Sequence, residues 1–360
     1  MRSKKLLLIM LLMFTAIFAT ACGGSKGSDS KSASKDEKTA EGENGAKVEI
    51  VSTEYALPEY KIATNLGENE LILKVKVSVK NTSKEPLEVS NDDFSLYQGK
   101  SKVSDETSYD DRIGYENLNP DKSIEGSLYY KVDKGEKYQL EYTPSLRGTK
   151  KGKTLTFNLD GNDFMDSAKK LQEPAQALQA YTDITLFGQD NSDFETLTGE
   201  NKRKIVTDYL EGAQKSFTRS FDIYESDSIN KKKLNKLISA VQQTYKEKSK
   251  LHLETVSINN TDNEATVKAT ITPIDSSGVK ERVQKRIEEY GKKSGKDYIS
   301  REDLINPTID ILAEEFKHAE TASTEKTIDV KMKKTKDGKW QLDVNGYSAE
   351  DYFSSFYGTN

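Results

Sequence analysis

The sequence is poor in the residues that most often carry acid–base chemistry and metal binding. It contains two histidines, His252 and His318, and one cysteine, Cys22, among 360 residues. A single cysteine excludes an intrachain disulfide, and a zinc site needs several Cys or His side chains close together. We therefore expect no metal site and no cofactor, and we expect both histidines to be structural or solvated.

The sequence also lacks a basic tract interleaved with aromatic residues. It has 54 Lys and Arg residues against 59 Asp and Glu residues, which gives a formal net charge of −5. A mildly acidic, evenly mixed surface favours solubility and repels the phosphate backbone of nucleic acids. We therefore predict that nucleic acid is not a partner.

Long apolar runs are absent except at the N-terminus. Three basic residues within the first five precede a mostly apolar run from Leu6 to about Phe18, which closes on Ala19-Thr20-Ala21-Cys22. This layout is typical of an export signal. The run is shorter than the roughly 20 residues of a membrane-spanning helix, and Gly23-Gly24-Ser25-Lys26 follows it directly. Residues 1–21 are predicted to be a cleaved signal peptide.

The segment Ala19-Thr20-Ala21-Cys22 resembles the bacterial lipobox, although Ala19 stands where leucine is usual. The resemblance implies that the Cys22 thiol takes a diacylglyceryl group and that cleavage between Ala21 and Cys22 then leaves Cys22 as the first residue. One acyl chain holds a protein only marginally, whereas two or more anchor it stably. We therefore expect a lipid-anchored protein on the extracytoplasmic face of the cell membrane. The alternative is an ordinary cleaved signal followed by a stray cysteine.

Composition divides the rest of the chain into three parts. Residues 22–46 are predicted to be a lipidated cysteine followed by a disordered tether. After Cys22, this segment contains no large apolar residue that could be buried in a core. Residues 47–160 and 161–360 are predicted to be two domains because a little over 300 residues exceed the usual size of one.

Residues 47–160 show the period-two pattern of strands. Leu71, Leu73, Val75, Val77 and Val79 alternate with polar residues and precede the turn-forming segment 81–86. Further short strands are expected at 87–89, 94–97, 124–132, 138–142 and 154–159, with no helical stretch between them. Repeated short strands separated by turns predict an immunoglobulin-like β-sandwich.

Residues 161–360 switch to the helical period. Apolar stripes are expected on three helices, at 205–221, 234–245 and 279–290. Pro174 is expected to kink an earlier helix or to start a second piece, and Pro307 is expected in the first turn of a last helix. Alternating runs at 265–271 and 328–332 and the Asp337-Gly338 turn before Trp340 predict a small antiparallel sheet. The second domain is therefore expected to be α+β, with helices over one sheet face and room for a cavity.

Two family resemblances support this division. Val77-Ser-Val-Lys-Asn-Thr-Ser-Lys-Glu-Pro-Leu-Glu-Val89, followed by Asp93-Phe94 and by Leu118-Asn-Pro-Asp-Lys-Ser123, resembles the immunoprotective-extracellular Ig-like domain of Gram-positive lipoproteins, domain of unknown function 4352. Residues 168–181 and the closing segment 331–342 resemble domain of unknown function 5105. The last hairpin is also similar to those of cone-shaped, cystatin-like folds of the nuclear transport factor 2 type. Neither family brings a catalytic residue.

Two acidic segments and one glycine-rich loop are candidate ligand sites. Asp92-Asp93 and Asp105 to Asp111 lack the ligand spacing of a calcium loop and are expected to be turns. The segment 148–154 imitates a phosphate loop but precedes a strand, so we expect a lysine-rich turn.

Tyrosines are the remaining candidates for contact with a partner. Clusters occur at Tyr129-Tyr130, Tyr138 and Tyr142, and in the tail from Tyr347 to Tyr357. We expect most of them to fill the cores, because aromatic residues favour strands and dominate small cores. An exposed tyrosine set would be the plausible binding surface.

These observations predict a non-enzymatic, membrane-anchored binding protein of the cell envelope, whose partner is a protein or a cell-wall ligand. The alternative is a small-molecule binding protein or a proton-transfer enzyme that uses a cavity in the second domain. That alternative requires a carboxylate with a raised pKa inside the cavity. A transporter receptor is a third possibility, but such receptors alternate strands and helices in two lobes.

Overall fold

The computed structural model describes residues 39–41, 45–60, 66–106, 109–145, 152–220, 230–295, 298–344 and 347–358. The predicted signal peptide, Ala21 and Cys22 lie outside this range, as does most of the predicted tether. Contacts divide the chain into two compact units. The described residues from Thr39 to Gln172, together with Val256–Asp262, group in the first unit, and the other described residues from Glu173 onward group in the second.

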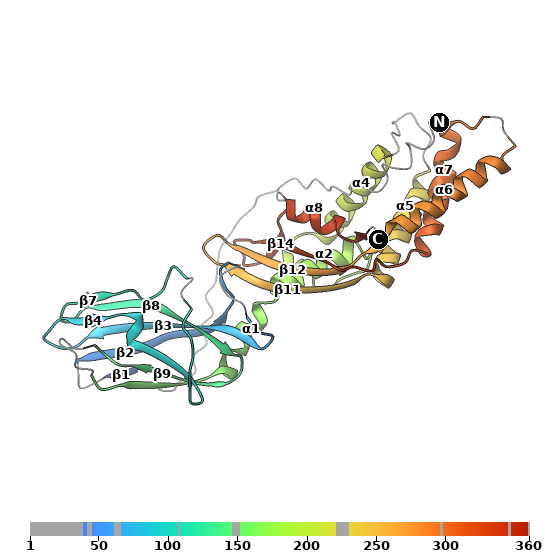
Figure 1. The fold of residues 1–360 in the computed structure, drawn as a ribbon. Coiled ribbons are helices and arrows are strands. Elements are labelled where there is room, and N and C mark those ends of the chain that lie inside the picture. The colour runs from blue at the N-terminus through green and yellow to red at the C-terminus, as the bar shows by residue number, and fades with distance from the viewer. Residues whose placement is uncertain are drawn as a thin grey trace. The chain divides into compact units, whose positions relative to one another are not determined.

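The first unit is a β-sandwich, as predicted (Figure 1). One sheet has the order β1-β2-β3-β8 and the other the order β10-β9-β5-β6, and all their pairs are antiparallel. The first sheet consists of β1 (Thr39–Glu41), β2 (Ala46–Ala56), β3 (Glu70–Asn81) and β8 (Ser123–Asp133). The second consists of β5 (Phe94–Gln98), β6 (Ser101–Lys102), β9 (Lys137–Tyr142) and β10 (Leu155–Asp160). A ribbon of β4 (Leu87–Val89) and β7 (Glu116–Leu118) and the short helices η2 (Asn91–Asp93) and η3 (Gly161–Phe164) complete it.

The alternation in β3 explains the sandwich core. Val75, Val77 and Val79 are fully buried, whereas Lys74 and Lys76, which alternate with them, are partly exposed. Successive side chains of a strand point to opposite faces, so one polar and one apolar face follow directly from the sequence. Leu128 of the neighbouring strand β8 and Leu96 and Leu140 of the facing sheet are part of the same core.

The edges of the first sheet are protected in ways that the sequence did not reveal. Thr39–Glu41, predicted as tether, instead forms β1 and pairs with Lys47–Glu49 of β2. Beyond that pair, β2 has a bulge between Ile50 and Ser52. There the Tyr55 amide donates to the Ser167 hydroxyl of α1 (Met165–Lys170) at 2.8 Å. Bulges and covering segments are common means of blocking an edge strand from pairing with another chain.

The helix α1 therefore belongs structurally with the sandwich. The first unit runs to Gln172, beyond the boundary at residue 160 predicted from the change of period. The helical pattern of apolar residues begins at α1. This helix covers a strand edge of the first unit, so the pattern changes from strand to helix before the chain enters the second unit.

The acidic loop between β6 and β7 covers the outer edge of β8. The amides of Glu106 and Ile113 donate to carbonyls of β8 at 2.8 and 3.0 Å. The Asp111 carboxylate accepts hydrogen bonds from Tyr129, from Ser127 at 3.0 Å and from Lys74 at 2.9 Å. These contacts give the acidic residues a structural role in place of the simple solvated turn that we expected.

The Asn-Thr-Ser motif closes one end of the sandwich. Asn81 is fully buried, and its amide nitrogen donates to the Glu85 and Leu118 carbonyls, each at 2.8 Å. Its side-chain oxygen accepts from the amide and the hydroxyl of Ser83, each at 2.8 Å. The side chain therefore ties two loops together with all four of its hydrogen bonds made.

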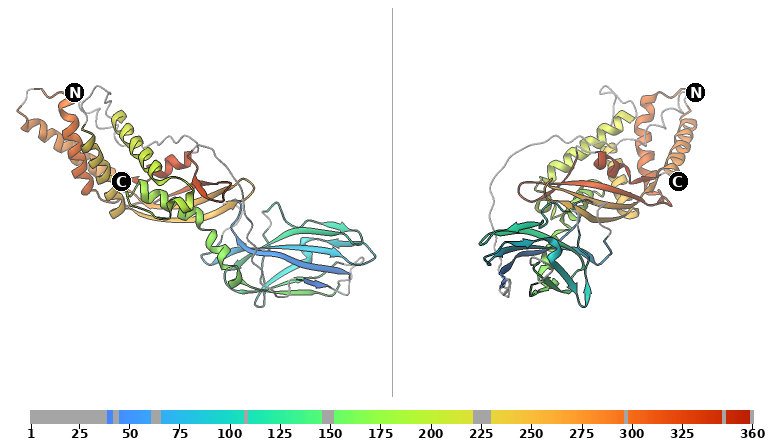
Figure 2. Two further views of the ribbon diagram at one scale, coloured as in Figure 1. Left: turned by 180° about the vertical axis from the view of Figure 1, so that it is seen from behind. Right: turned by 60° about the vertical axis from the view of Figure 1, so that its left-hand side comes forward.

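The second unit is α+β, again as predicted. Its sheet has the order β11-β12-β14-β15, with β11 (Lys250–Asn259), β12 (Glu264–Thr272), β14 (Lys326–Lys334) and β15 (Trp340–Leu342). The helices α2 (Glu173–Thr185), α3 (Phe194–Thr198) and α8 (Tyr347–Ser354) contact this sheet. The four longer helices are α4 (Lys202–Ser220), α5 (Lys231–Lys248), α6 (Ser276–Lys293) and α7 (Arg301–Lys317). Two short strands, β13 (Ile274–Asp275) and β16 (Tyr357–Gly358), pair in parallel. The helices α5, α6 and α7 lie side by side in Figures 1 and 2.

Local signals place most of these elements, with two exceptions. Pro174 lies in the first turn of α2, and Gly338 has the positive φ of 76° that the β14–β15 turn requires. Pro307, by contrast, lies inside α7 and not in its first turn. The helix begins earlier because Ser300 and Asp303 form a capping box. Tyr290 was expected on the buried stripe of α6 but is 40% exposed, and Phe221 of the α4 stripe lies outside the described residues.

We predict that Asn81→Ala lowers the free energy of unfolding of the sandwich by about 1–3 kcal/mol, because the Leu118 carbonyl loses this buried donor and the Glu85 carbonyl keeps only the Ser83 hydroxyl. Hydrogen exchange of the β3 amides measures this loss in the full chain. Trp340, the only tryptophan, lies in the second unit, so its fluorescence transition should not move. Thr82→Ala, at an exposed neighbouring position, serves as the control and should change stability by less than about 0.5 kcal/mol. Equal exchange in the two variants would contradict the structural role of Asn81.

Candidate functional site

The residues singled out in the sequence do not come together in one site. His252 lies on β11 and His318 at the end of α7, and both are exposed. Within the described ranges, no group of three or more His, Cys, Asp or Glu side chains is placed to hold a metal ion. Most of the glycine-rich segment 148–154 lies outside those ranges.

The acidic pair Asp92-Asp93 has a structural role. Asp93 is buried, and its carboxylate accepts from the Ser90 amide at 2.8 Å and from the Ser145 hydroxyl at 2.7 Å. The first of these bonds belongs to the capping box of η2. Both oxygens of Asp93 are thus already engaged by the fold of the sandwich.

Most of the clustered tyrosines fill the cores, as predicted. The four tyrosines of the first cluster are at most 3% exposed, and they are Tyr129, Tyr130, Tyr138 and Tyr142. In the tail, Tyr352 and Phe356 are fully buried, whereas Tyr347 is 87% exposed. In the described part of the chain, Tyr347 is therefore the one member of these clusters among the large exposed side chains.

Aromatic rings occupy the space between the helices and the sheet of the second unit. The Phe356 ring lies 5.6 Å from that of Tyr352 and 5.7 Å from that of Tyr245, centroid to centroid. The Tyr352 hydroxyl shares a hydrogen bond of 2.6 Å with the Thr182 hydroxyl of α2. These side chains fill the region in which the alternative function requires a cavity.

One half-buried carboxylate in the second unit matches part of that alternative. Glu200, between α3 and α4, accepts a hydrogen bond from the Tyr181 hydroxyl of α2. Burial raises the pKa of Glu200, and the charge of Lys204 opposes this shift. The Tyr181 ring packs edge-to-face on Phe194 with the centroids 5.0 Å apart. A tyrosine and a carboxylate of raised pKa are the groups that a proton transfer would use.

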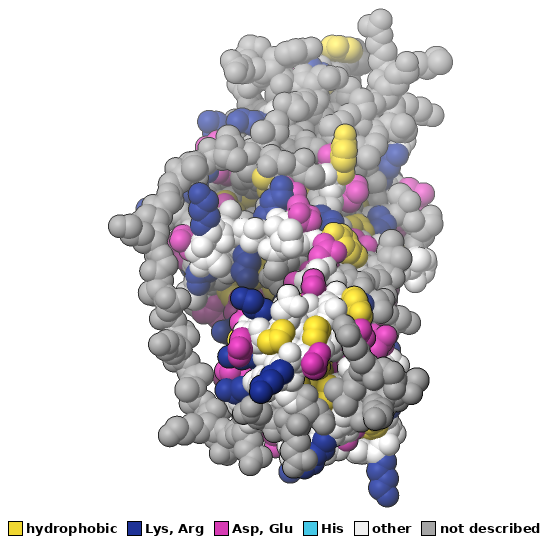
Figure 3. Space-filling model, turned by 90° about the vertical axis from the view of Figure 1, so that its left-hand side faces the viewer, with side chains coloured by type: hydrophobic (Ala, Val, Ile, Leu, Met, Phe, Trp, Pro, Cys, Tyr) yellow, Lys and Arg dark blue, Asp and Glu magenta, His cyan; other side chains and the backbone are white. Residues whose placement is uncertain are grey.

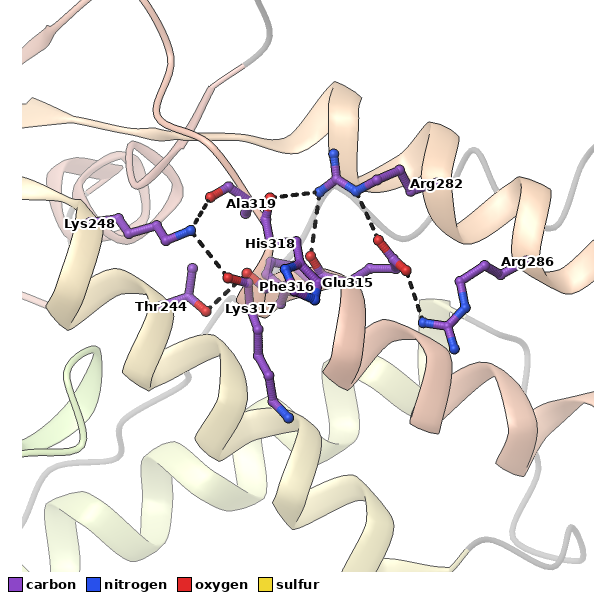
Figure 4. A network of polar contacts seen from close by, with 9 residues as sticks. All are labelled: Thr244, Lys248, Arg282, Arg286, Glu315, Phe316, Lys317, His318 and Ala319. Atoms are coloured by element: carbon purple, nitrogen blue, oxygen red, sulfur yellow. Dashed lines mark hydrogen bonds and ion pairs between the residues drawn. The ribbon is translucent and has the colours of Figure 1, made fainter.

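The strongest polar arrangement in the second unit joins α6 to α7 (Figure 4). The Glu315 side chain is 9% exposed and accepts from Arg282 Nε at 2.8 Å and from Arg286 Nη1 at 2.9 Å. Burial opposes ionisation of this carboxyl, but the hydrogen bonds and charges of the two arginines outweigh it and lower the pKa of Glu315. Arg282 and Arg286 are four residues apart on α6, so they share one helix face. We call these three residues the Glu315 clip.

The C-terminal end of α7 is held by cationic and hydroxyl donors (Figure 4). Lys248 Nζ donates to the Ala319 and Lys317 carbonyls at 2.6 and 3.1 Å. The Thr244 hydroxyl donates to the Phe316 carbonyl at 3.1 Å, and Arg282 Nη2 to the His318 carbonyl at 3.2 Å. The last carbonyls of a helix lack intrahelical partners and carry partial negative charge, so donors from α5 and α6 complete them.

Sequence reasoning missed the Glu315 clip. The spacing of Arg282 and Arg286 by four residues does indicate that two cationic side chains share one face of α6. The partner carboxylate lies 29 residues from Arg286 along the chain. Its position depends on the pairing of α6 with α7, which no local pattern specifies.

The opposite end of the α6–α7 hairpin carries exposed tyrosines. Tyr290 is 40% exposed near the end of α6, and Tyr298, before α7, is 80% exposed. A Cβ at Gly291 would meet Ile299 Cδ1 at 3.6 Å, so Ile299 lies against α6 at this glycine. This contact keeps the segment before α7 beside the last turns of α6.

The surface of the sandwich offers a different kind of contact. On the face shown in Figure 3, described Lys and Arg side chains are interspersed with Asp and Glu, and apolar side chains lie among them. Tyr115 and Tyr60 of the first unit are 67% and 57% exposed. Aromatic side chains are enriched at the centres of surfaces that bind partners.

Comparisons with known proteins agree with this two-unit architecture. A relative from Bacillus subtilis (strain 168), the uncharacterized lipoprotein YcdA, is 38% identical over 360 residues, and the match covers 99% of each chain. The chain belongs to the family of lipoprotein YcdA. The domain of unknown function DUF4352 matches residues 41–153, and DUF5105 matches residues 164–357.

The crystal structure of YcdA shares the fold over its whole length. It superposes with a TM-score of 0.81 at 37% identity and covers 90% of this chain and 100% of that one. The sandwich followed by an α+β unit is thereby confirmed, and so are both domain resemblances. Membership of a lipoprotein family indicates anchoring to a membrane by lipid. None of the described helices is long and apolar enough to span a bilayer. The resemblance to nuclear transport factor 2 folds stays a prediction.

We predict that Glu315→Gln lowers the free energy of unfolding of the second unit by about 1–3 kcal/mol at neutral pH, the range for lost hydrogen bonds to charged groups. The guanidinium groups are partly exposed, which keeps the loss below that of a fully buried pair. Urea unfolding followed by the fluorescence of Trp340 measures it.

The loss should depend on pH in one direction. Because the pKa of Glu315 is lowered in the folded state, its contribution is complete above the ordinary glutamate pKa of about 4.3 and disappears as the pH falls through the folded value. The difference between the parent and Glu315→Gln should therefore shrink on acidification. Glu281→Gln, at an exposed position of the neighbouring helix α6, is the control. A difference that grew on acidification would contradict the role of the clip.

Proposed function

We propose that the chain is an extracytoplasmic lipoprotein, anchored through acyl chains on Cys22, that binds a partner protein or a cell-wall polymer and has no catalytic role. The observation that carries the proposal is the contrast between engaged carboxylates and free aromatic side chains. Glu315 and Asp93 are engaged in hydrogen bonds within their own units. Tyr115 and Tyr347 present most of their surface to solvent.

Large exposed tyrosines support binding for a physical reason. A tyrosine buries much apolar area on contact while its hydroxyl retains a hydrogen bond, and it has few rotatable bonds to order. The scarcity of histidine and cysteine favours a binding role over catalysis, since these residues supply most proton-transfer and nucleophilic chemistry at neutral pH.

A second candidate is small-molecule binding or proton transfer in the second unit. It is favoured by the Tyr181–Glu200 contact and by the raised pKa of Glu200. The hydrogen bond suits either protonation state, because tyrosine donates to a carboxylate and a protonated carboxyl donates to the tyrosine oxygen. The aromatic packing around Phe356 leaves this candidate second.

The anchor is tested with Cys22→Ser in cells fed a clickable palmitate analogue. The parent and the control Ser25→Ala should carry the label and fractionate with membranes, and protease added to intact protoplasts should degrade both. Cys22→Ser should lose the label completely, because the diacylglyceryl group that carries the acyl chains is attached through the thiol. Label on Cys22→Ser, or protection of the parent from external protease, would contradict the anchor or its predicted membrane face.

Binding is tested with a photo-crosslinking residue placed at Tyr115 and at Tyr347 in intact cells. Lys100 and Lys336, exposed in the same two units, are the matched controls. We expect a discrete light-dependent adduct at a tyrosine position that is absent at its control. Identical adduct patterns at all four positions would contradict a tyrosine-centred binding surface. Turnover of a broad hydrolase panel by the mature chain, abolished by Glu200→Gln, would favour the second candidate.

A further inference from the structure

One edge of the sheet of the second unit is open. The strand β11 stands first in the order β11-β12-β14-β15, so it has a neighbouring strand on one side only (Figure 1). From Val256 onward β11 groups with the first unit, and the Ile258 amide donates to the Pro58 carbonyl at 3.0 Å. Within the described ranges, no backbone hydrogen bond joins residues 250–254 to a segment outside their own sheet. We call residues 250–254 the open edge.

The open edge alternates charged and apolar side chains. Its sequence is Lys250-Leu-His-Leu-Glu254. Lys250 and His252 are exposed, and Leu251 and Leu253 are half-buried. The two leucines share one side of the strand, and the three polar residues share the other. Unpaired N–H and C=O groups along such an edge are a template for another strand.

We infer that the open edge pairs with the open edge of a second copy of this chain, antiparallel and with a two-fold axis through His252. The segment is complementary to itself about that residue. Lys250 then faces Glu254 of the second copy, and Leu251 faces Leu253 of the second copy. Directly opposite residues lie on the same side of a sheet, so opposite charges meet on one side and leucines meet on the other.

Backbone geometry leaves few alternative registers. Only alternate residues of a strand turn their N–H and C=O groups toward the edge, so the axis of a two-fold antiparallel pair passes through a residue. An axis through Leu251 would place Lys250 opposite His252. An axis through Leu253 would place Lys250 opposite Val256, which already groups with the first unit. The axis through His252 gives both charges a partner and keeps the pairing within the open edge.

The charges on the polar side of the open edge favour this register. Glu254 forms an ion pair of 2.7 Å with Lys268 of β12, and its side chain is still 47% exposed. In the paired sheet, this carboxylate would lie between Lys268 and Lys250 of the second copy. A lysine on an edge strand usually discourages pairing, but in this register each Lys250 meets a carboxylate.

Charges at the end of the preceding helix α5 do not oppose the pairing. Lys246 and Glu247 are both exposed there and balance each other. Lys248 donates to the Lys317 and Ala319 carbonyls at the end of α7, so its ammonium group is held within its own chain.

Five paired residues make a small contact, which is typical of weak and transient association. On a membrane, the anchor of the proposed function would raise the effective concentration of one copy around another. The pairing itself requires neither the anchor nor the partner proposed above, so it is measured without them.

The test uses single cysteines in the mature chain carrying Cys22→Ser, which removes the only native thiol. Directly opposite residues of an antiparallel pair have Cα atoms about 4.5–5.5 Å apart, within the range that a disulfide spans. His252→Cys should therefore form a covalent dimer on mild oxidation. Lys250→Cys alone and Glu254→Cys alone should not, because the two identical positions lie about 13 Å apart along the strands. An equal mixture of these two variants should cross-link.

Matched controls separate pairing from random collision and from misfolding. Lys336→Cys, at an exposed position of the β14–β15 turn, should stay monomeric under the same oxidation. In the His252→Cys background, Lys250→Glu should lower the dimer yield several-fold, because it places like charges opposite each other at Glu254. Lys336→Glu in that background should not. An unchanged Trp340 fluorescence transition verifies that each variant is folded.

Three results would overturn the inference. The first is an equal dimer yield from His252→Cys and Lys336→Cys. The second is a yield from Lys250→Cys alone that matches its mixture with Glu254→Cys. The third is a His252→Cys chain that stays monomeric when pure and cross-links only to other proteins in intact cells, which would assign the open edge to a different partner.

Discussion

Burial of one face of each sheet against a second layer is the interaction on which both units depend. With a single cysteine, the chain cannot cross-link itself, so apolar burial and hydrogen bonding must supply all of its stability. In the sandwich the second layer is another sheet, and in the second unit it is a set of helices. Val77 at the centre of β3 and Val330 at the centre of β14 are both fully buried, although their covering layers differ.

Polar residues are used where this burial cannot reach. Loops and helix ends carry unpaired backbone groups that must find partners or water. Asn81 pairs the carbonyls of two sandwich loops, and Lys248 with Arg282 pairs those at the end of α7. In both places one or two side chains hold segments that are distant in sequence, so these residues fix the geometry of the surfaces around them.

The periodicity of apolar residues predicted most helices and strands because it depends only on neighbouring residues. It gave no information where an element is ordered by contacts with residues distant in sequence. The alternation of β3 and the Asp337-Gly338 turn follow from neighbouring residues alone. The pairing of Thr39–Glu41 with β2 was missed because that segment has no apolar pattern and is ordered by hydrogen bonds to a strand already buried. Tyr290 was misplaced because it continues the spacing of Val279 and Val283, while the helix itself extends past the core. The apolar stripe of a helix does not indicate how far along the helix the neighbouring elements continue to cover it.

The same limit applies to the candidate sites. The export signal and the lipobox resemblance are contained in one short segment, so the sequence was sufficient to predict them. The Glu315 clip depends on how α6 packs against α7. Cys22 lies outside the described residues, so the anchor is supported by its sequence and by the lipoprotein family alone.

The strand β1 changes what the anchor implies for the first unit. Since Thr39–Glu41 is paired to β2, the predicted spacer shrinks to the residues between Cys22 and Thr39. A random-coil chain of that length would have an average reach of about 20–25 Å, compared with about 25–30 Å for the whole predicted tether. The proposed anchor would then hold the sandwich edge at β1 within a few nanometres of the lipid. Under that proposal, a contact made by either unit with the envelope needs little affinity of its own, because the anchor would already have removed most of the translational freedom that binding costs.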